Sequence, residues 1–304
     1  MNPKPKPAFF QAAIDRYVEE HVDYYGERLA AIYVEGSVHR GEAIPGVSDL
    51  DTYVYIDGAR QEGDKEWQEK LQATLRREIL GFHVVEDAKL TREAFPPGHS
   101  VDPEQENEVL RWLLFRKWCF ENPTDDAQEN IRREAIAYDE EMYKRQGQLS
   151  FGVEARQLRY DATLVWGRDL VAGMTIPPWN RLWAQAYPAY FELPSNVARY
   201  AAGLEENYTV FKLPESPPLR LHKLGRLGVL CSAALLMGCN EFRSFKAREV
   251  LPPLKQRFPQ WSEFLDETND LATQLVVARE ERLAAYTNDL VRWVDWVAGQ
   301  LRDE

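Results

Sequence analysis

Apolar residues in the first third of the chain alternate between a helical spacing and a strand-like spacing. From residue 8 to about residue 24 they recur four positions apart, as at Phe9, Ala13 and Tyr17, which predicts an amphipathic helix. Three shorter segments are apolar and contain the β-branched or aromatic residues that strands favour. The pattern therefore predicts strands over residues 29–35, 49–56 and 84–90, with a second helix over residues 64–79.

From about residue 104 onwards the spacing of apolar residues is mostly helical. Pairs of prolines punctuate this part of the chain at residues 177–178, 217–218 and 252–253, because proline does not continue a helix. The helices expected here cover residues 107–120, 127–145, 179–204, 222–238 and 265–302. Residues 162–167 interrupt the helical pattern with an apolar run and form a candidate strand that returns to the sheet.

The order of these elements predicts an α+β fold in two parts. A small α/β domain with a mixed sheet is expected at residues 1–100, followed by a mainly helical domain at residues 101–304. The chain has 304 residues, which is long enough for two domains, and its 44% of hydrophobic residues supply a core. Charged residues make up 28% of the chain, as in soluble globular proteins, so a disordered chain is excluded.

Charge, cysteines and the N-terminus narrow the choice of partners and of location. The formal net charge is −12, which argues against a large nucleic-acid partner and suits a small cationic one. The residues before the first helix contain no apolar stretch, and no apolar run approaches the roughly 20 residues that cross a bilayer. We therefore expect a cytoplasmic protein without a membrane segment. Reduced core cysteines agree with this location, and the three are Cys119, Cys231 and Cys239.

One segment contains candidate metal-binding and catalytic residues. A predicted strand runs into Gly36 and Ser37, a loop follows, and the next predicted strand opens with Asp49 and Asp51. Residues two apart on a strand share a face, so the two carboxylates are expected to lie side by side. Adjacent carboxylates repel one another unless a cation lies between them, and Mg²⁺ binds one or two carboxylates together with water and phosphate oxygens. Asp49 and Asp51 are therefore predicted magnesium ligands.

The loop between these two strands suits a phosphate. Gly36 lets the backbone approach a phosphate closely, and the Ser37 hydroxyl and successive loop N–H groups can donate to its oxygens. Arg40 adds a charged donor, and Ser48, which leads into the two acids, is a further candidate nucleotide contact. A merely solvated loop does not explain why two acids open an otherwise apolar strand.

The order strand, Gly-Ser, loop and Asp-x-Asp resembles the DNA polymerase β-type nucleotidyltransferase superfamily. In that family a third carboxylate lies on a later strand, and here Asp87 is the candidate. Glu86 is the alternative, because the register of one short strand is easily misjudged. The resemblance implies that Asp87 completes a metal site with Asp49 and Asp51 and helps to activate an acceptor hydroxyl. Two Mg²⁺ ions about 3.5–4 Å apart would then stabilise both the attacking and the leaving oxygen.

The helical half is similar to the accessory domain of bacterial antibiotic nucleotidyltransferases, particularly the aminoglycoside adenylyltransferases. Residues 158–170 resemble their apolar strand that ends in an aromatic-Gly-x-acid turn, and residues 221–260 resemble their order of helix, Ser-Lys, helix and Leu-Pro. In that family the lysine reaches the triphosphate, which implies this role for Lys246, although Phe245 separates it from Ser244. The competing cations on the preceding helix are Lys223 and Arg226.

These features lead to an enzymatic hypothesis. The chain is expected to transfer a nucleoside monophosphate, in the first place AMP from ATP, to a hydroxyl group of a small-molecule acceptor and to release pyrophosphate. An aminoglycoside-like antibiotic is the leading acceptor, and a nucleotide, an RNA end or a protein side chain are the alternatives. A different class of function is a non-catalytic module that senses a nucleotide or neutralises a toxin. The three candidate carboxylates argue against that class, because a site that only binds needs no second metal.

Overall fold

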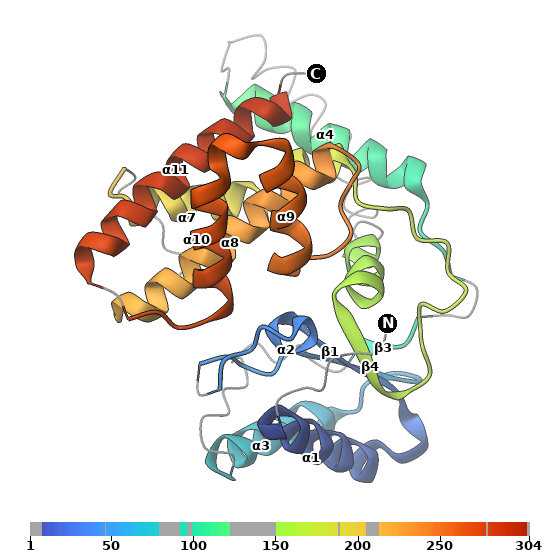
Figure 1. Cartoon of the computed structure of the whole chain (residues 1–304). Coiled ribbons are helices and arrows are strands. Elements are labelled where there is room, and N and C mark those ends of the chain that lie inside the picture. The colour runs from blue at the N-terminus through green and yellow to red at the C-terminus, as the bar shows by residue number, and fades with distance from the viewer. Residues whose placement is uncertain are drawn as a thin grey trace. The chain divides into compact units, whose positions relative to one another are not determined.

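The computed structural model describes residues 8–45, 47–78, 92–95, 99–121, 150–187, 189–204, 213–277 and 279–302. The chain divides into two compact units, shown in Figure 1. The first unit contains a four-stranded sheet, whereas the described residues of the second unit form helices and their connections. This arrangement confirms the expected α+β fold. The units consist of Met1–Ser100 with Ala155–Met174, and of Val101–Glu154 with Thr175–Glu304.

The sheet has the strand order β3-β2-β1-β4. β1 (Leu29–Glu35) is fully buried and pairs antiparallel with β2 (Thr52–Ile56) on one side and with β4 (Ala162–Gly167) on the other. β3 (Arg92–Glu93) pairs parallel with β2. The candidate strand at residues 162–167 is therefore part of this sheet, next to the strand that carries the Gly-Ser turn at its end.

β2 begins at Thr52, later than the sequence predicts, and the two acids lie just before it. Asp51 still continues the ladder, because its carbonyl oxygen accepts a hydrogen bond of 3.0 Å from the Glu35 N–H. Leu50 is only 2% exposed, whereas Asp49 and Asp51 are half-buried, so the alternation of a strand extends back through both acids. The regular strand starts later because its partner β1 ends at Glu35.

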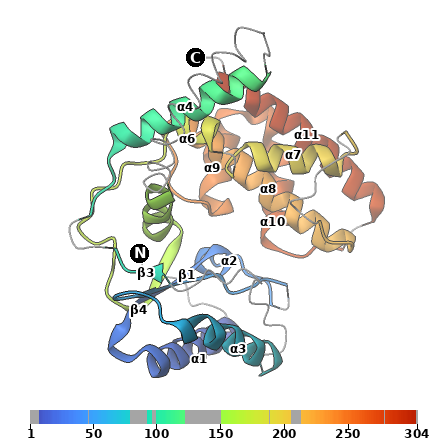
Figure 2. The same cartoon turned by 180° about the vertical axis from the view of Figure 1, so that it is seen from behind.

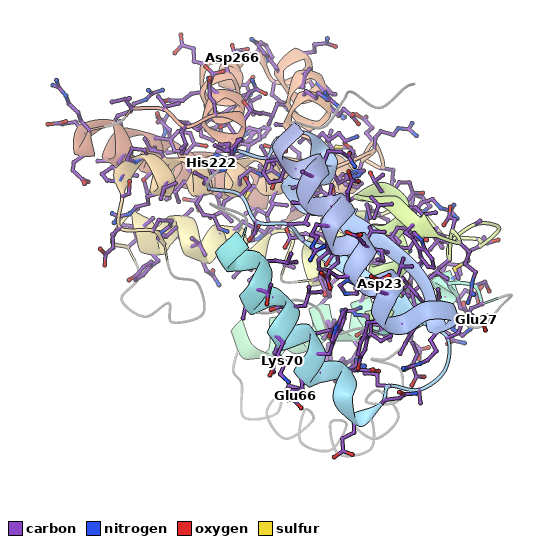
Figure 3. The ribbon with its side chains drawn as sticks, turned by 90° about the horizontal axis from the view of Figure 1, so that it is seen from below. Asp23, Glu27, Glu66, Lys70, His222 and Asp266 are labelled. Atoms are coloured by element: carbon purple, nitrogen blue, oxygen red, sulfur yellow. The ribbon has the colours of Figure 1, made fainter. Side chains whose placement is uncertain are left out.

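α1 (Ala8–Tyr25) and α3 (Glu62–Glu78) lie side by side against one face of the sheet, as Figures 1 and 2 show. Both helices were predicted, and their buried apolar side chains meet those of the strands. The outward faces are charged: Figure 3 shows Glu66 and Lys70 on α3, where Lys70 Nζ lies 2.7 Å from Glu66 Oε1. The shared core includes Phe10, Ile14, Ile32, Val34, Val54, Ile56, Leu71 and Leu75.

The predicted strand over residues 84–90, which includes Asp87 and Glu86, lies outside the described residues. The predicted helix over residues 127–145 lies outside them as well. Short helical turns complete the first unit at η1 (Gly26–Arg28) and at α2 (Gly36–Arg40). Within the part of the chain that is described, no helix is long and apolar enough to cross a membrane.

α8 (Pro217–Gly238) is the central helix of the second unit. Its two prolines occupy the first helical turn, where a missing N–H costs nothing, so the helix begins at the proline pair and not at residue 222 as predicted. Gly225 allows close packing, because a Cβ atom there would lie 2.8 Å from the Ala272 backbone nitrogen. The helices around α8 are α6 (Arg181–Ala186), α7 (Glu192–Ala201), α9 (Ala247–Arg257), α10 (Ser262–Thr273) and α11 (Glu280–Arg302), while α4 (Pro103–Glu121) packs on α6 and η2 (Pro259–Trp261) links α9 to α10.

Two long predicted helices are wrong in their length. The helix expected over residues 179–204 is divided into α6 and α7, and the helix expected over residues 265–302 is divided into α10 and α11. At the first break Tyr187 is extended, with φ −91° and ψ 111°. The next residue in the sequence is Pro188, and a residue before proline favours this conformation.

The proline pair at residues 252–253 also departs from the prediction, because it lies inside α9 and does not end a helix. Each proline removes one backbone N–H from the helix and disfavours the helical conformation of the residue before it. Tertiary packing outweighs this local cost here. The side chains of Val250, Leu251 and Leu254 are buried in the core of the second unit.

Candidate functional site

The turn at the end of β1 lies directly against Asp51. α2 begins at Gly36, whose φ of +67° is in the left-handed region that favours glycine. A Cβ atom at this position would lie 2.4 Å from Asp51 Oδ2, which is closer than any real side chain approaches. Only glycine therefore allows the backbone to come this close to the carboxylate. The structure brings the Gly-Ser turn and the second predicted metal ligand together.

Asp49 and Asp51 flank the buried Leu50 and are both half-buried. The residue that follows them is anchored to the helical layer, because the Thr52 hydroxyl donates a hydrogen bond of 2.9 Å to the Tyr17 hydroxyl oxygen. Burial raises the pKa of Tyr17 to about 12, so this hydroxyl stays neutral. The backbone that presents the two carboxylates is thus fixed on one side by β1 and on the other by α1.

The loop between Gly36 and the two acids is closed by its own hydrogen bonds. Gly41 ends α2 with a φ of +72°, and the Glu42 N–H then donates to the Ser37 carbonyl oxygen at 2.9 Å. Further along, the Ile44 N–H donates to Ser48 Oγ and the Ser48 N–H donates to the Ile44 carbonyl oxygen, both at 2.8 Å. Ser48 therefore shapes the loop. Its hydroxyl proton can still donate to another group, so its predicted contact with a nucleotide stays a prediction.

Arg40 is paired with two buried carboxylates. Its Nη1 atom lies 2.6 Å from Asp161 Oδ2, and its Nε atom lies 3.3 Å from Glu42 Oε2. A guanidinium group has five N–H donors, so these two pairs leave donors for a phosphate. The sequence predicts a phosphate contact for Arg40 but does not predict its pairing with Asp161, an acid 121 positions further along the chain.

Lys246 lies in the second unit, at the residue before α9. Its backbone N–H donates to Ser244 Oγ at 3.1 Å, and its Nζ atom lies 3.8 Å from Glu249 Oε1. The competing cations Lys223 and Arg226 lie on α8. The contact of one of these cations with a triphosphate stays a prediction.

The acids before β2 fit the ligand preference of magnesium. Carboxylate oxygens are the ligands that Mg²⁺ prefers in proteins, and the missing side chain at Gly36 lets Asp51 Oδ2 lie directly against the turn. Among the described residues there is no group of three side chains that would hold a metal ion. The third predicted carboxylate, Asp87 or Glu86, lies outside those residues.

Comparison with known proteins identifies one domain, most of which lies in the first unit. Residues 14–110 match the family of the nucleotidyltransferase domain, and this range includes Gly36, Asp49 and Asp51. No curated protein matches the chain. Among solved structures, the chain is similar to spectinomycin adenyltransferase AAD(9) from Enterococcus faecialis with ATP and spectinomycin, at 13% identity and a TM-score of 0.43 over 94% of this chain and 99% of that chain. A likeness at this level carries no conclusion about substrates.

The superfamily expected from the Gly-Ser and Asp-x-Asp pattern is confirmed by the family match. The match covers the strands on both sides of that pattern and the helices that pack on them. The chain carries a nucleotidyltransferase domain and is a nucleotidyltransferase.

Proposed function

We propose that this nucleotidyltransferase moves AMP from ATP to a hydroxyl group of a small molecule in a magnesium-dependent reaction. The contact between Gly36 and Asp51 carries this proposal. It joins a turn whose N–H groups suit phosphate oxygens to a carboxylate that suits a metal ion. A nucleoside triphosphate needs both at once, because its phosphate oxygens accept hydrogen bonds and coordinate Mg²⁺.

Each residue has a defined role in the proposed reaction. Asp49 and Asp51 hold Mg²⁺, which when bound neutralises the charge that develops on the phosphate oxygens. Asp87, or Glu86 in its place, accepts the proton of the acceptor hydroxyl. The acceptor oxygen then bonds to the α-phosphorus, while the bond from that phosphorus to the bridging oxygen breaks and pyrophosphate leaves. The phosphates are held by Gly36, Ser37, Arg40 and Ser48 of the first unit, and the contact of Lys246 with the triphosphate stays a prediction from the sequence.

The proposed acceptor is an aminoglycoside-like antibiotic. The sequence of the helical half resembles the accessory domain of aminoglycoside adenylyltransferases. The net charge of −12 supports a cationic acceptor, because an acidic protein attracts cations from solution. The protein would then confer resistance by adding a bulky anionic group to the antibiotic.

Pyrophosphate release from each NTP, measured with Mg²⁺ and a panel of acceptors, tests this function. The panel contains aminoglycosides, lincosamides, nucleotides and tRNA, so that the alternative acceptors are tested together. We expect release with ATP and one small-molecule acceptor, and none from the Asp51→Asn variant. Asp57→Asn is the matched control, because Asp57 is an exposed acid paired with Arg168 at the far end of β2.

Two outcomes would change the proposal. Normal turnover by Asp51→Asn would remove Asp51 from the metal site. Magnesium-dependent ATP binding without pyrophosphate release for any acceptor would favour the non-catalytic module.

A further inference from the structure

Two consecutive residues of α2 reach the beginning of β4. Arg40 Nη1 lies 2.6 Å from Asp161 Oδ2, and His39 Nδ1 lies 2.7 Å from Thr163 Oγ1. Asp161 and Thr163 are separated from α2 by more than a third of the chain, yet both belong to the first unit. α2 is thus attached at two neighbouring points, one on β4 at Thr163 and one at Asp161 directly before it.

The Arg40–Asp161 pair is shielded from solvent. The side chains of Arg40 and Asp161 are only 13% and 12% exposed, so salt and water screen their attraction less than they screen a surface pair. Glu42, from the loop after α2, approaches the same guanidinium group. The pair therefore fixes the direction of a side chain that would otherwise have several rotamers.

The anchored element has little stability of its own. α2 contains five residues, and a helix of this length does not persist without tertiary contacts. Its first two residues, Gly36 and Ser37, are the proposed phosphate contacts, and its last residue is Arg40. The orientation of the phosphate-binding turn therefore depends on what holds the other end of α2.

We propose that Asp161 is a positioning residue of the nucleotide site. Through Arg40 it holds α2 so that the N–H groups of the Gly36 turn, and the remaining N–H groups of the guanidinium, face the triphosphate. This inference rests on the proposed function. The inference also assigns a role to β4. This strand comes from the second half of the chain and, together with Asp161 before it, orients the Gly36 turn, which comes from the first half.

The direction in which neutralisation of Asp161 changes the nucleotide affinity distinguishes a positioning role from a purely electrostatic effect. Asp161 is an anion close to a site for an anion, so charge alone predicts that its neutralisation strengthens nucleotide binding. Positioning predicts the opposite, because Arg40 and α2 lose their orientation. Since one charge-assisted hydrogen bond to a phosphate contributes about tenfold to affinity, we expect Asp161→Asn to weaken binding by about that factor.

The test measures the affinity of the full-length protein for a magnesium complex of α,β-methylene ATP, which cannot release pyrophosphate. Calorimetry gives the Kd for wild type, Asp161→Asn and Asp57→Asn, together with each Tm. Asp57→Asn is the matched control, because it breaks an ion pair with Arg168 at the other end of β4 without touching α2. We expect a Kd about tenfold higher for Asp161→Asn only, and no further increase when Asp161→Asn is added to Arg40→Ala.

Thr163→Val provides a second measurement if Asp161→Asn does not fold. This variant keeps the ion pair and removes only the hydroxyl that bonds to His39, and its Kd is expected to rise about threefold. If Asp161→Asn folds, unchanged or tighter binding by this variant would overturn the positioning role. If it does not fold, unchanged or tighter binding by Thr163→Val would do so. Either result would leave the proposed function standing. A wild-type protein that does not bind the analogue would instead overturn the proposed function, and this inference with it.

Discussion

Replacement of Gly36 by alanine perturbs the contact between Asp51 and the turn that we propose binds phosphate. An L-residue at the φ of +67° costs about 1–2 kcal/mol of stability. The added Cβ atom would also lie 2.4 Å from Asp51 Oδ2, whereas ordinary contact begins at 3.4 Å. The carboxylate or the turn must therefore move by about 1 Å.

The displacement matters more for activity than for folding. A misplacement of about 1 Å at a reacting centre costs about a hundredfold in rate, and Mg²⁺ tolerates little departure from its ligand distances of about 2.0–2.1 Å. We therefore expect Gly36→Ala to lower kcat/KM about a hundredfold. Its free energy of unfolding should fall by only about 1–2 kcal/mol.

Gly41→Ala is the matched control for this prediction. Gly41 has a similar φ of +72°, but a Cβ atom there would meet nothing within 4 Å. This variant has the same backbone cost without a clash, so its free energy of unfolding should fall by a similar amount. Its activity should stay within about threefold of the wild-type activity. The assay is steady-state pyrophosphate release, with urea unfolding measured on the same preparations. Equal activity in the two variants would refute the proposed link between Gly36 and Asp51.

Two further predictions concern stability. Burial lowers the pKa of His21 to about 4, against 6.5 in the unfolded chain, so unfolding takes up a proton at low pH. The free energy of unfolding should therefore fall by about 2 kcal/mol between pH 7.5 and pH 5. Urea unfolding at both pH values measures this change. An equal fall in the His21→Gln variant would contradict the assignment of the change to His21. Gly225→Ala should destabilise the second unit by about 1–3 kcal/mol through overpacking against α10. Gly299→Ala on α11, whose Cβ would meet nothing within 4 Å, should instead stabilise the second unit by about 0.5–1 kcal/mol. Thermal unfolding measures the stability of both variants. A change of the same sign in Gly225→Ala and Gly299→Ala would contradict this prediction.

In the first unit, α1, α3, β1 and β4 were predictable because their signals are local, whereas the two-residue strand β3 and the five-residue helix α2 were not predicted. The spacing of apolar residues defines α1 and α3, and the apolar run of β1 ends at a glycine. The closeness of Gly36 to Asp51 was implied by the family resemblance, but its atomic reason, a missing Cβ beside the carboxylate, required coordinates.

The partner of Arg40 could not be predicted from the sequence. Asp161 is separated from Arg40 by 121 positions, and a pairing over such a distance leaves no periodic pattern. The only available signal was its place directly before the apolar run that becomes β4. Two predictions that involve prolines were wrong for opposite reasons. The helix expected over residues 179–204 ignored Pro188, which is a local signal in the sequence for the end of α6. The prolines at residues 252–253 were expected to interrupt a helix, but the packing of buried side chains outweighs their local cost inside α9.

The proposed function requires Asp49 and Asp51 to support magnesium-dependent transfer of AMP to a hydroxyl group. The most direct measurement is mass spectrometry of the acceptor after incubation with ATP and Mg²⁺, with pyrophosphate quantified in the same reaction. Wild type should yield an acceptor that carries one AMP and one pyrophosphate for each acceptor modified, and Asp51→Asn should yield neither. A phosphorylated acceptor, or adenylylation by Asp51→Asn at the wild-type rate, would contradict the claim.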